Sequence, residues 1–166
     1  CDWYIELAKA RLIAGGSGAA AVRRNLVFVL DQALRLLHPM MPFLTEEIWR
    51  RLPVEEAHRA PALMVAAWPP GLERFRDEGA ERSVGLLQEL VTAVRAVRAR
   101  YSVPPRTLLT IAVKAPEGEG QVLESMAHDV CALAGVGGIT IGADVTRPPH
   151  ASVAVAGRSE VYVSLE

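Results

Sequence analysis

The spacing of the apolar residues changes after Pro104-Pro105, and this change limits the folds that the chain can adopt. Before the two prolines, apolar residues recur every three or four positions, as they do on one face of an amphipathic helix. After them, Leu109, Ile111 and Val113 occupy alternate positions, which is typical of a half-buried strand. The sequence therefore predicts a mainly α protein with a small α+β part.

Three helices are predicted before residue 54. The first covers the start of the chain and ends at the glycine run of residues 15–18. The second, residues 19–38, carries one apolar stripe and is stopped by Pro39. The third is short, with Thr45 as its N-cap and Pro53 at its end. Such stripes are buried most simply in an antiparallel helical bundle.

Residues 54–77 lose the helical period and contain several prolines, so we predict an irregular connection with a short extended piece at 64–68. The elements expected after it are a helix at 80–101, a strand at 109–113, a helix at 121–134 ending at Gly135, a strand at 139–141 and a hairpin turning at Gly157-Arg158. We therefore expect two domains. Residues 1–77 form a helical bundle and its connection, and residues 78–166 form a long helix with a strand-helix-strand-hairpin subdomain.

Composition argues against several classes of protein. Of the 166 residues, 51% are hydrophobic, which is enough for one substantial core or two small ones and excludes a disordered tail. No apolar stretch approaches the roughly 20 residues of a membrane span. Cys1 and Cys131 show no paired spacing, and no cluster has the spacing of metal ligands. We therefore predict a protein of the cytoplasm with no catalytic residue, metal or cofactor of its own.

Local charge is more informative than the formal net charge of -1. Residues 82–114 hold six basic residues and one acid, and Arg95 and Arg98 share a helical face. A second basic group flanks the glycine run and consists of Lys9, Arg11, Arg23 and Arg24. Such clusters can neutralise phosphates. The alternative is that the arginine stems only cover apolar surface and pair with acids elsewhere.

Four segments resemble valyl-tRNA synthetases, which are class Ia aminoacyl-tRNA synthetases. They are CDWYIELAK at residues 1–9, LLHPMMPFLTEEIW at 36–49, Trp68-Pro69, and VRAVRA at 94–99. The second is typical of the class Ia enzymes with large aliphatic substrates, and the first favours the valine enzyme over the isoleucine and leucine ones. The resemblance is strong over residues 1–105 and looser beyond them.

The resemblance implies an anticodon-binding helical bundle followed by a small α+β region from the C-terminal part of such an enzyme. The family's HIGH and KMSKS signatures, which hold ATP, do not occur in this sequence. ATP is thus expected only in the full-length enzyme, and this chain alone is expected to be inactive. Since the chain opens on Cys1 within a helical pattern, we expect a further helix upstream. The implied partners are a valine-accepting tRNA and the catalytic and editing domains of the same polypeptide.

Within this interpretation, the basic residues are candidates for contacts with tRNA phosphates. Lys9, Arg11, Arg23 and Arg24 come first, and Arg95 and Arg98 follow. Trp3 and Tyr4 are candidates for stacking on unpaired bases, although adjacent residues cannot both face the same way. Phe43 and Trp49 are expected in the core.

Three alternatives remain open. The chain could be a structural module that packs on the synthetase body without touching RNA. A large exposed apolar patch, together with basic residues engaged in ion pairs, would favour this alternative. It could be the equivalent region of an isoleucyl or leucyl enzyme. An independent small enzyme would need a pocket of convergent titratable groups, for which the sequence offers no pattern.

Overall fold

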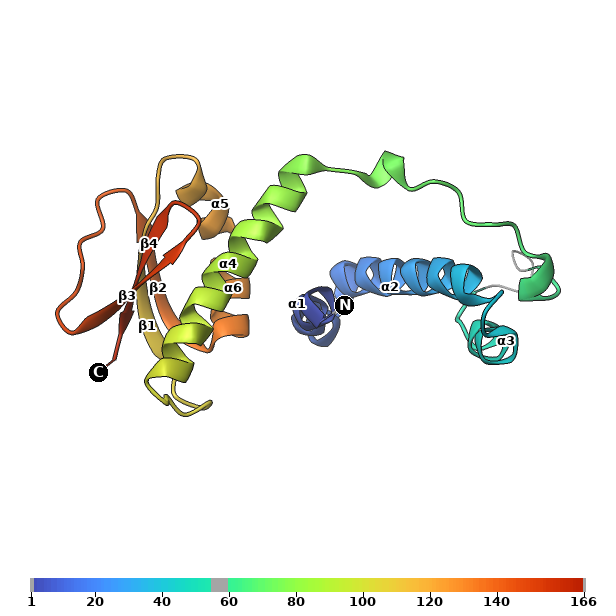
Figure 1. Ribbon diagram of the computed structural model, residues 1–166, viewed down its shortest axis with the longest axis horizontal. Coiled ribbons are helices and arrows are strands. Elements are labelled where there is room, and N and C mark those ends of the chain that lie inside the picture. The colour runs from blue at the N-terminus through green and yellow to red at the C-terminus, as the bar shows by residue number, and fades with distance from the viewer. Residues whose placement is uncertain (1, 55–59, 166) are drawn as a thin grey trace. The chain divides into compact units, whose positions relative to one another are not determined.

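The computed structural model describes residues 2–54 and 60–165 and divides the chain into two compact units (Figure 1). Unit 1 is Cys1–Arg76 and unit 2 is Asp77–Glu166. Unit 1 is helical, and unit 2 combines helices with a four-stranded sheet. The prediction of a mainly helical protein with a small part containing strands is confirmed.

Within residues 2–54 and 60–76, unit 1 contains three α-helices and two short 3-10 turns. They are α1 (Asp2–Ala14), α2 (Gly16–Leu37), α3 (Pro42–Arg50), η2 (Leu63–Val65) and η3 (Glu73–Phe75). Helix α2 packs against both α1 and α3, and α3 packs against η2. Leu34, Trp49 and Leu63 form a buried cluster, one residue from each of α2, α3 and η2. Unit 1 is thus organised around α2.

The turn between α1 and α2 is tighter than the sequence suggests. We predicted a break over residues 15–18, but Gly15 alone separates the helices, and Gly16 to Gly18 already belong to α2. Gly15 and Gly16 have φ angles of 75° and 69°, which only glycine adopts without strain. These two glycines turn the chain so that α1 and α2 run in clearly different directions (Figure 1), while Gly18 lies in the first turn of α2 and interrupts no hydrogen bonds of the helix interior.

Helix α3 begins at Pro42, so the prediction that Thr45 is its N-cap is wrong. Proline suits the first turn of a helix, where its missing N–H has no partner to lose. Thr45 lies buried one turn further on, and its hydroxyl donates to the carbonyl oxygen of Met41 at 2.8 Å. The same hydroxyl oxygen lies within hydrogen-bond distance of His38, 2.8 Å from its Nδ1. Thr45 therefore links α3 to the end of α2.

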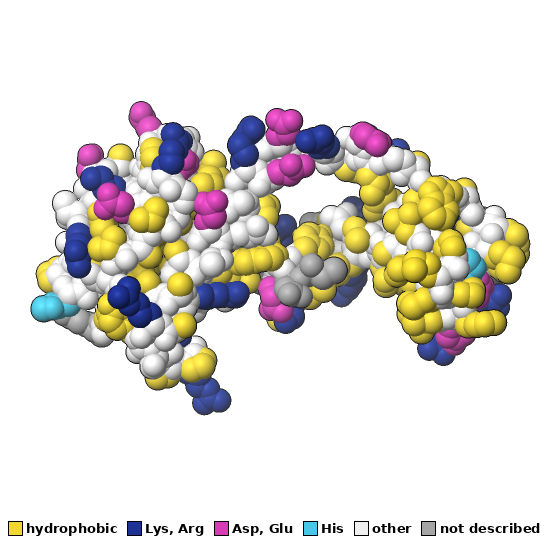
Figure 2. Space-filling model, viewed as in Figure 1, with side chains coloured by type: hydrophobic (Ala, Val, Ile, Leu, Met, Phe, Trp, Pro, Cys, Tyr) yellow, Lys and Arg dark blue, Asp and Glu magenta, His cyan; other side chains and the backbone are white. Residues whose placement is uncertain are grey.

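The prediction that Phe43 lies in the core is also wrong, because its side chain is 91% exposed. Six positions separate Phe43 from Trp49, so the two side chains point about 120° apart around α3, and Trp49 is only 3% exposed as predicted. Met40 and Met64 are also largely exposed, at 81% and 77%. Figure 2 shows hydrophobic side chains gathered over the end of unit 1 that carries α3. Unit 1 therefore leaves a large apolar surface uncovered.

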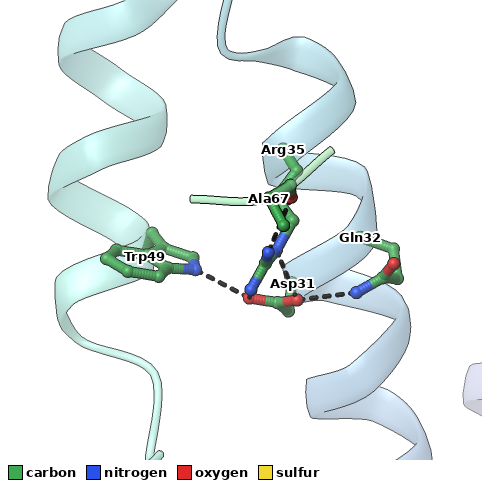
Figure 3. A network of polar contacts seen from close by, with 5 residues as sticks. All are labelled: Asp31, Gln32, Arg35, Trp49 and Ala67. Carbon is green, nitrogen blue, oxygen red and sulfur yellow. Dashed lines mark hydrogen bonds and ion pairs between the residues drawn. The ribbon is translucent and has the colours of Figure 1, made fainter. Parts of the chain in front are cut away.

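The carboxylate of Asp31 joins three parts of unit 1 (Figure 3). One oxygen accepts from the Trp49 indole nitrogen at 2.7 Å, and the other accepts from Nε of Arg35 at 2.9 Å and from Gln32 at 2.7 Å. Arg35 also donates to the carbonyl oxygen of Ala67 at 2.8 Å. The largely buried carboxylate thus connects α2 directly to α3 and, through Arg35, to the segment after η2.

Unit 2 is a mixed sheet covered by helices. Its elements are α4 (Glu78–Arg100), β1 (Leu109–Lys114), α5 (Glu119–Ser125), α6 (Ala127–Ala134), β2 (Val136–Gly142), β3 (Ala151–Ala156) and β4 (Ser159–Ser164). The strand order is β2-β1-β4-β3; β1 runs parallel to β2, and the other pairs are antiparallel. Leu87, Leu90 and Val91 of α4 are fully buried, as are Val113, Val161 and Val163 of the central strands. These residues form the core of unit 2.

Several predicted boundaries in both units need correction. The predicted helix at 121–134 is two helices, because the chain leaves the helical conformation at Met126. The predicted extended piece at 64–68 is in part the 3-10 turn η2, and part of the irregular connection, residues 55–59, lies outside the described residues. The helix end at Gly135, with its left-handed conformation, and the hairpin around Gly157 are confirmed.

Replacing Asp31 by asparagine tests the role of its carboxylate. We expect Asp31→Asn to lower the free energy of unfolding of unit 1 by about 2 kcal/mol, because charge-assisted bonds to Trp49 and Arg35 weaken. The matched control is Glu47→Gln, which removes an exposed carboxylate from an equivalent i,i+4 pair with Arg51 and should cost less than about 0.5 kcal/mol. Urea unfolding followed by tryptophan fluorescence measures both, since all three tryptophans lie in unit 1, and equal effects would contradict the assignment.

Candidate nucleic-acid interface

A groove of about 530 Å³ runs along one face of α2 in unit 1. We call it the α2 groove; it is lined by Ala20, Arg23, Arg24, Val27, Phe28, Asp31 and Arg35 of α2 and by Pro53 and Val54. The α2 residues follow spacings of three and four, so they form one stripe of the helix. Part of the basic cluster predicted around the glycine run therefore lies in a concave surface.

The cations of the α2 groove differ in how they are engaged. Arg35 is paired with Asp31, so these two charges offset each other within the groove. Arg23 and Arg24 are exposed, and within residues 2–54 and 60–165 neither makes a hydrogen bond or an ion pair. The groove consequently offers two guanidinium groups to a ligand with negative charge.

An aromatic ring accompanies these guanidinium groups. Phe28 is 38% exposed, and its ring meets that of Phe75 edge to face, with centroids 5.7 Å apart. The guanidinium of Arg74 lies over the Phe75 ring, 4.7 Å from its centroid. The Phe75 ring thus packs against the Phe28 ring where Phe28 lines the groove. Phe28 was not among the residues predicted from the sequence; its position four residues after Arg24 on one stripe was the available signal.

The candidates on α1 are placed differently. Lys9 forms an ion pair with Glu6 at 2.6 Å on its own helix, and Arg11 is exposed in the last turn. Trp3 is half-buried, and the hydroxyl of Tyr4 accepts a hydrogen bond from Asn25 of α2 at 3.3 Å. The lining of the α2 groove includes none of these four residues. The structure thus brings Arg23 and Arg24 together in the groove without Lys9 and Arg11.

Arg95 and Arg98 of α4 bind backbone carbonyl groups within unit 2. Arg95 donates through Nε and an amino nitrogen to the carbonyl oxygen of Leu133, at 3.2 and 2.8 Å. Arg98 donates to the carbonyl oxygens of Thr107, Gly135 and Pro104 at 2.9, 3.1 and 2.7 Å. Both side chains therefore attach α4 to the end of α6 and to the segment before β1. These bonds occupy donors that a phosphate would need.

Polar residues of the segment at 36–49 hold unit 1 together. Besides the roles of Thr45 and Trp49, Glu46 accepts from the backbone N–H of Leu63 at 2.8 Å and from Nε of Arg50 at 2.7 Å. The hydrogen bond from Arg50 is the main reason that the pKa of Glu46 lies below its ordinary value. The segment thus serves the packing of α2, α3 and η2.

Residues 2–54 and 60–165 contain neither a candidate metal-binding group nor a candidate membrane-spanning helix. No group of three or more His, Cys, Asp or Glu residues there could hold a metal ion. No helix in the same part of the chain is both long and apolar enough to cross a membrane.

Comparison with known proteins identifies the family. Residues 1–113 match the family described as the anticodon-binding domain of tRNA ligase. This chain belongs to that family. The match covers all of unit 1 and continues through α4 almost to the end of β1, so the anticodon-binding domain family accounts for segments of both units.

Individual relatives agree with this assignment. The chain is 40% identical to a valine-tRNA ligase of Lactiplantibacillus plantarum over 99% of its own length and 18% of that protein. It is 36% identical to a valine-tRNA ligase of Bacillus licheniformis over its whole length and 19% of that protein, and 42% identical to one of Enterococcus faecalis over 72% of the chain and 13% of that protein. The resemblance to valyl-tRNA synthetases is confirmed. The chain spans about a fifth of the length of these relatives.

Substitution of Arg98 tests whether its hydrogen bonds to backbone carbonyl groups stabilise unit 2. We expect Arg98→Gln to lower the free energy of unfolding of unit 2 by about 2 kcal/mol, because three backbone carbonyl groups lose a charged donor. The control is Arg100→Gln in the same helical turn, which should change stability by less than about 0.5 kcal/mol. Guanidinium unfolding followed by circular dichroism measures both; an Arg98 variant as stable as the control would contradict the assigned role.

Proposed function

We propose that this chain recognises the anticodon region of a valine-accepting tRNA as part of a valine-tRNA ligase. The observation that carries the proposal is membership of the anticodon-binding domain family over residues 1–113, together with relatives that are named valine-tRNA ligases. The full-length protein would attach valine to its tRNA with ATP. This chain would help to orient the tRNA for that reaction and to discriminate the valine-accepting tRNA from others.

The α2 groove supports a contact with RNA. Phosphate groups supply a large share of the affinity of nucleic-acid complexes, and guanidinium groups without competing partners neutralise them best. Arg23 and Arg24 meet this condition, so we propose them as the main phosphate contacts. Lys9 and Arg11 of α1 would add to the positive electrostatic potential that attracts the RNA. Trp3, on the same helix, remains a candidate for stacking on a base. Arg95 and Arg98 would contact RNA only with the donors that their carbonyl bonds leave free.

In the full-length enzyme, this chain would contact further domains of the same polypeptide. Helices α1 to α3 would form part of an antiparallel bundle, and the catalytic and editing domains of the same polypeptide would be its other partners. ATP would bind those domains, so this chain would hold no cofactor. The enzyme would act in the cytoplasm, where its tRNA is charged.

Binding to RNA tests the main proposal. The 166-residue chain should bind a valine-accepting tRNA with a log affinity that falls with log salt at a slope of about -1.4 or steeper, because each neutralised phosphate of a single strand contributes roughly 0.7. Fluorescence anisotropy between 50 and 300 mM salt measures the slope. The control is the same tRNA with an exchanged anticodon loop, which should bind more weakly. Affinity independent of salt, or equal for both RNAs, would argue against the proposal.

A second candidate function is docking on the synthetase body without RNA contact. The exposed apolar side chains around α3, including Phe43 and Met40, favour it, as do the arginines of α4 that bind carbonyl groups. Isolated domains rarely expose so many large apolar side chains in one region unless a partner covers them. The two functions are compatible, since the apolar surface and the α2 groove use different residues.

Docking is tested with a valine-tRNA ligase of Lactiplantibacillus plantarum from which the matching segment has been removed. The 166-residue chain should bind this protein, and Phe43→Ser should weaken the complex about tenfold or more, because a buried Phe side chain is worth about 1.5–3 kcal/mol. Val155→Ser, at an exposed site of unit 2, is the control and should leave the affinity unchanged. Calorimetric titration compares them, and equal affinities would remove support for a docking role of α3.

A further inference from the structure

We propose that the α2 groove holds one unpaired nucleotide of the bound RNA, with its base stacked on the Phe28 ring and its flanking phosphates at Arg23 and Arg24. The inference rests on the proposed function and extends it to a defined subsite. It assigns a base-stacking role to a residue outside the sequence-based candidates Trp3 and Tyr4.

The arrangement of the groove matches the chemistry of a single nucleotide. Arg24 and Phe28 are separated by four residues on one helical stripe, about 6 Å along the axis, so one ligand can reach both. Any base offers a π face to an aromatic ring, and stacking of this kind tolerates sequence variation. The apolar lining at Val27, Pro53 and Val54 suits the flat face and edges of a base.

The state of the lining residues favours binding without rearrangement. The edge-to-face contact with Phe75 already orients Phe28, so little side-chain freedom is lost when a base stacks on it. Arg23 and Arg24 make no hydrogen bond or ion pair within the described parts of the chain, so no internal partner must be released first. By contrast, Lys9 would have to leave Glu6.

The pairing of Asp31 with Arg35 sets the polarity of the groove. At that end the Asp31 carboxylate is paired with Arg35 and accepts hydrogen bonds from Gln32 and Trp49, so the pair carries no net positive charge that would attract a phosphate. The free cations lie toward the start of α2, at Arg23 and Arg24. A bound strand would therefore place its phosphates near Arg23 and Arg24 and keep them away from Asp31.

The experiment uses the 166-residue chain and a stem-loop RNA with the anticodon arm of a valine-accepting tRNA. The fluorescent base 2-aminopurine replaces one unpaired loop base at a time. We expect quenching at one loop position on binding, and loss of this quenching in Phe28→Leu, which keeps an apolar side chain but removes the π face. Phe28→Leu should also weaken binding roughly 5- to 150-fold. The matched control is Phe43→Leu on the exposed surface of α3, which should bind and quench like the original chain.

A second pair of variants tests the phosphate contacts. The double variant Arg23→Gln and Arg24→Gln should reduce the salt slope by about 1.4, the contribution of two single-strand phosphates. The control removes the same charge from unit 2 with Arg100→Gln and Arg106→Gln and should retain the slope. Circular dichroism verifies that the variants are folded.

The outcomes separate the inference from the proposed function. If the original chain binds the RNA with the expected salt dependence but no loop position is quenched, the inference is overturned and the proposed function stands. The same holds if the groove variants behave like their controls. If the original chain fails to bind the RNA at all, the proposed function fails and the subsite with it. Because the quenching measurement uses the unchanged chain, the absence of quenching overturns the inference even where a variant does not fold.

Discussion

Unit 1 depends on the shared carboxylate of Asp31. It is largely buried, and its oxygens accept hydrogen bonds from Trp49, Arg35 and Gln32, so the charge is compensated on every side. Because Trp49 belongs to α3 and Arg35 continues to the carbonyl group of Ala67, one charged group sets the positions of two elements relative to α2. Helix α2 is therefore held firmly at the end of the groove that Asp31 lines.

The same carboxylate shapes the candidate binding surface. By pairing with Arg35, Asp31 offsets one positive charge of the α2 groove, and Arg23 and Arg24 are the lining cations without a partner among the residues that the structure describes. The groove is thus asymmetric, neutral at the end that packs on α3 and positive toward the α1-α2 turn. In unit 2, Arg95 and Arg98 show the contrasting use of arginine, since their donors hold backbone carbonyl groups in place.

Much of the local structure could be predicted because it depends on neighbouring residues. The stripe of α2, the alternation of β1 and the end of α6 at Gly135 follow from side-chain periodicity and from the freedom of glycine. The errors lie at the start of α3, where several local signals compete. Thr45 resembles an N-cap from its neighbours, but Pro42 starts the helix earlier and His38 binds the Thr45 hydroxyl. Phe43 lies outside the core because Trp49 fills the interior side of α3.

By itself, the sequence determined the family and the order of most elements, because motifs and hydrophobic periods are properties of short segments. It also identified the basic residues from which an RNA site could be built. Only the tertiary structure decided which of them are available, because whether an arginine meets a carbonyl, a carboxylate or solvent depends on residues that may be far away in the chain. Arg98 contacts Gly135 across 37 positions, whereas Arg23 and Arg24 meet no such partner among the described residues and line a groove beside Phe28.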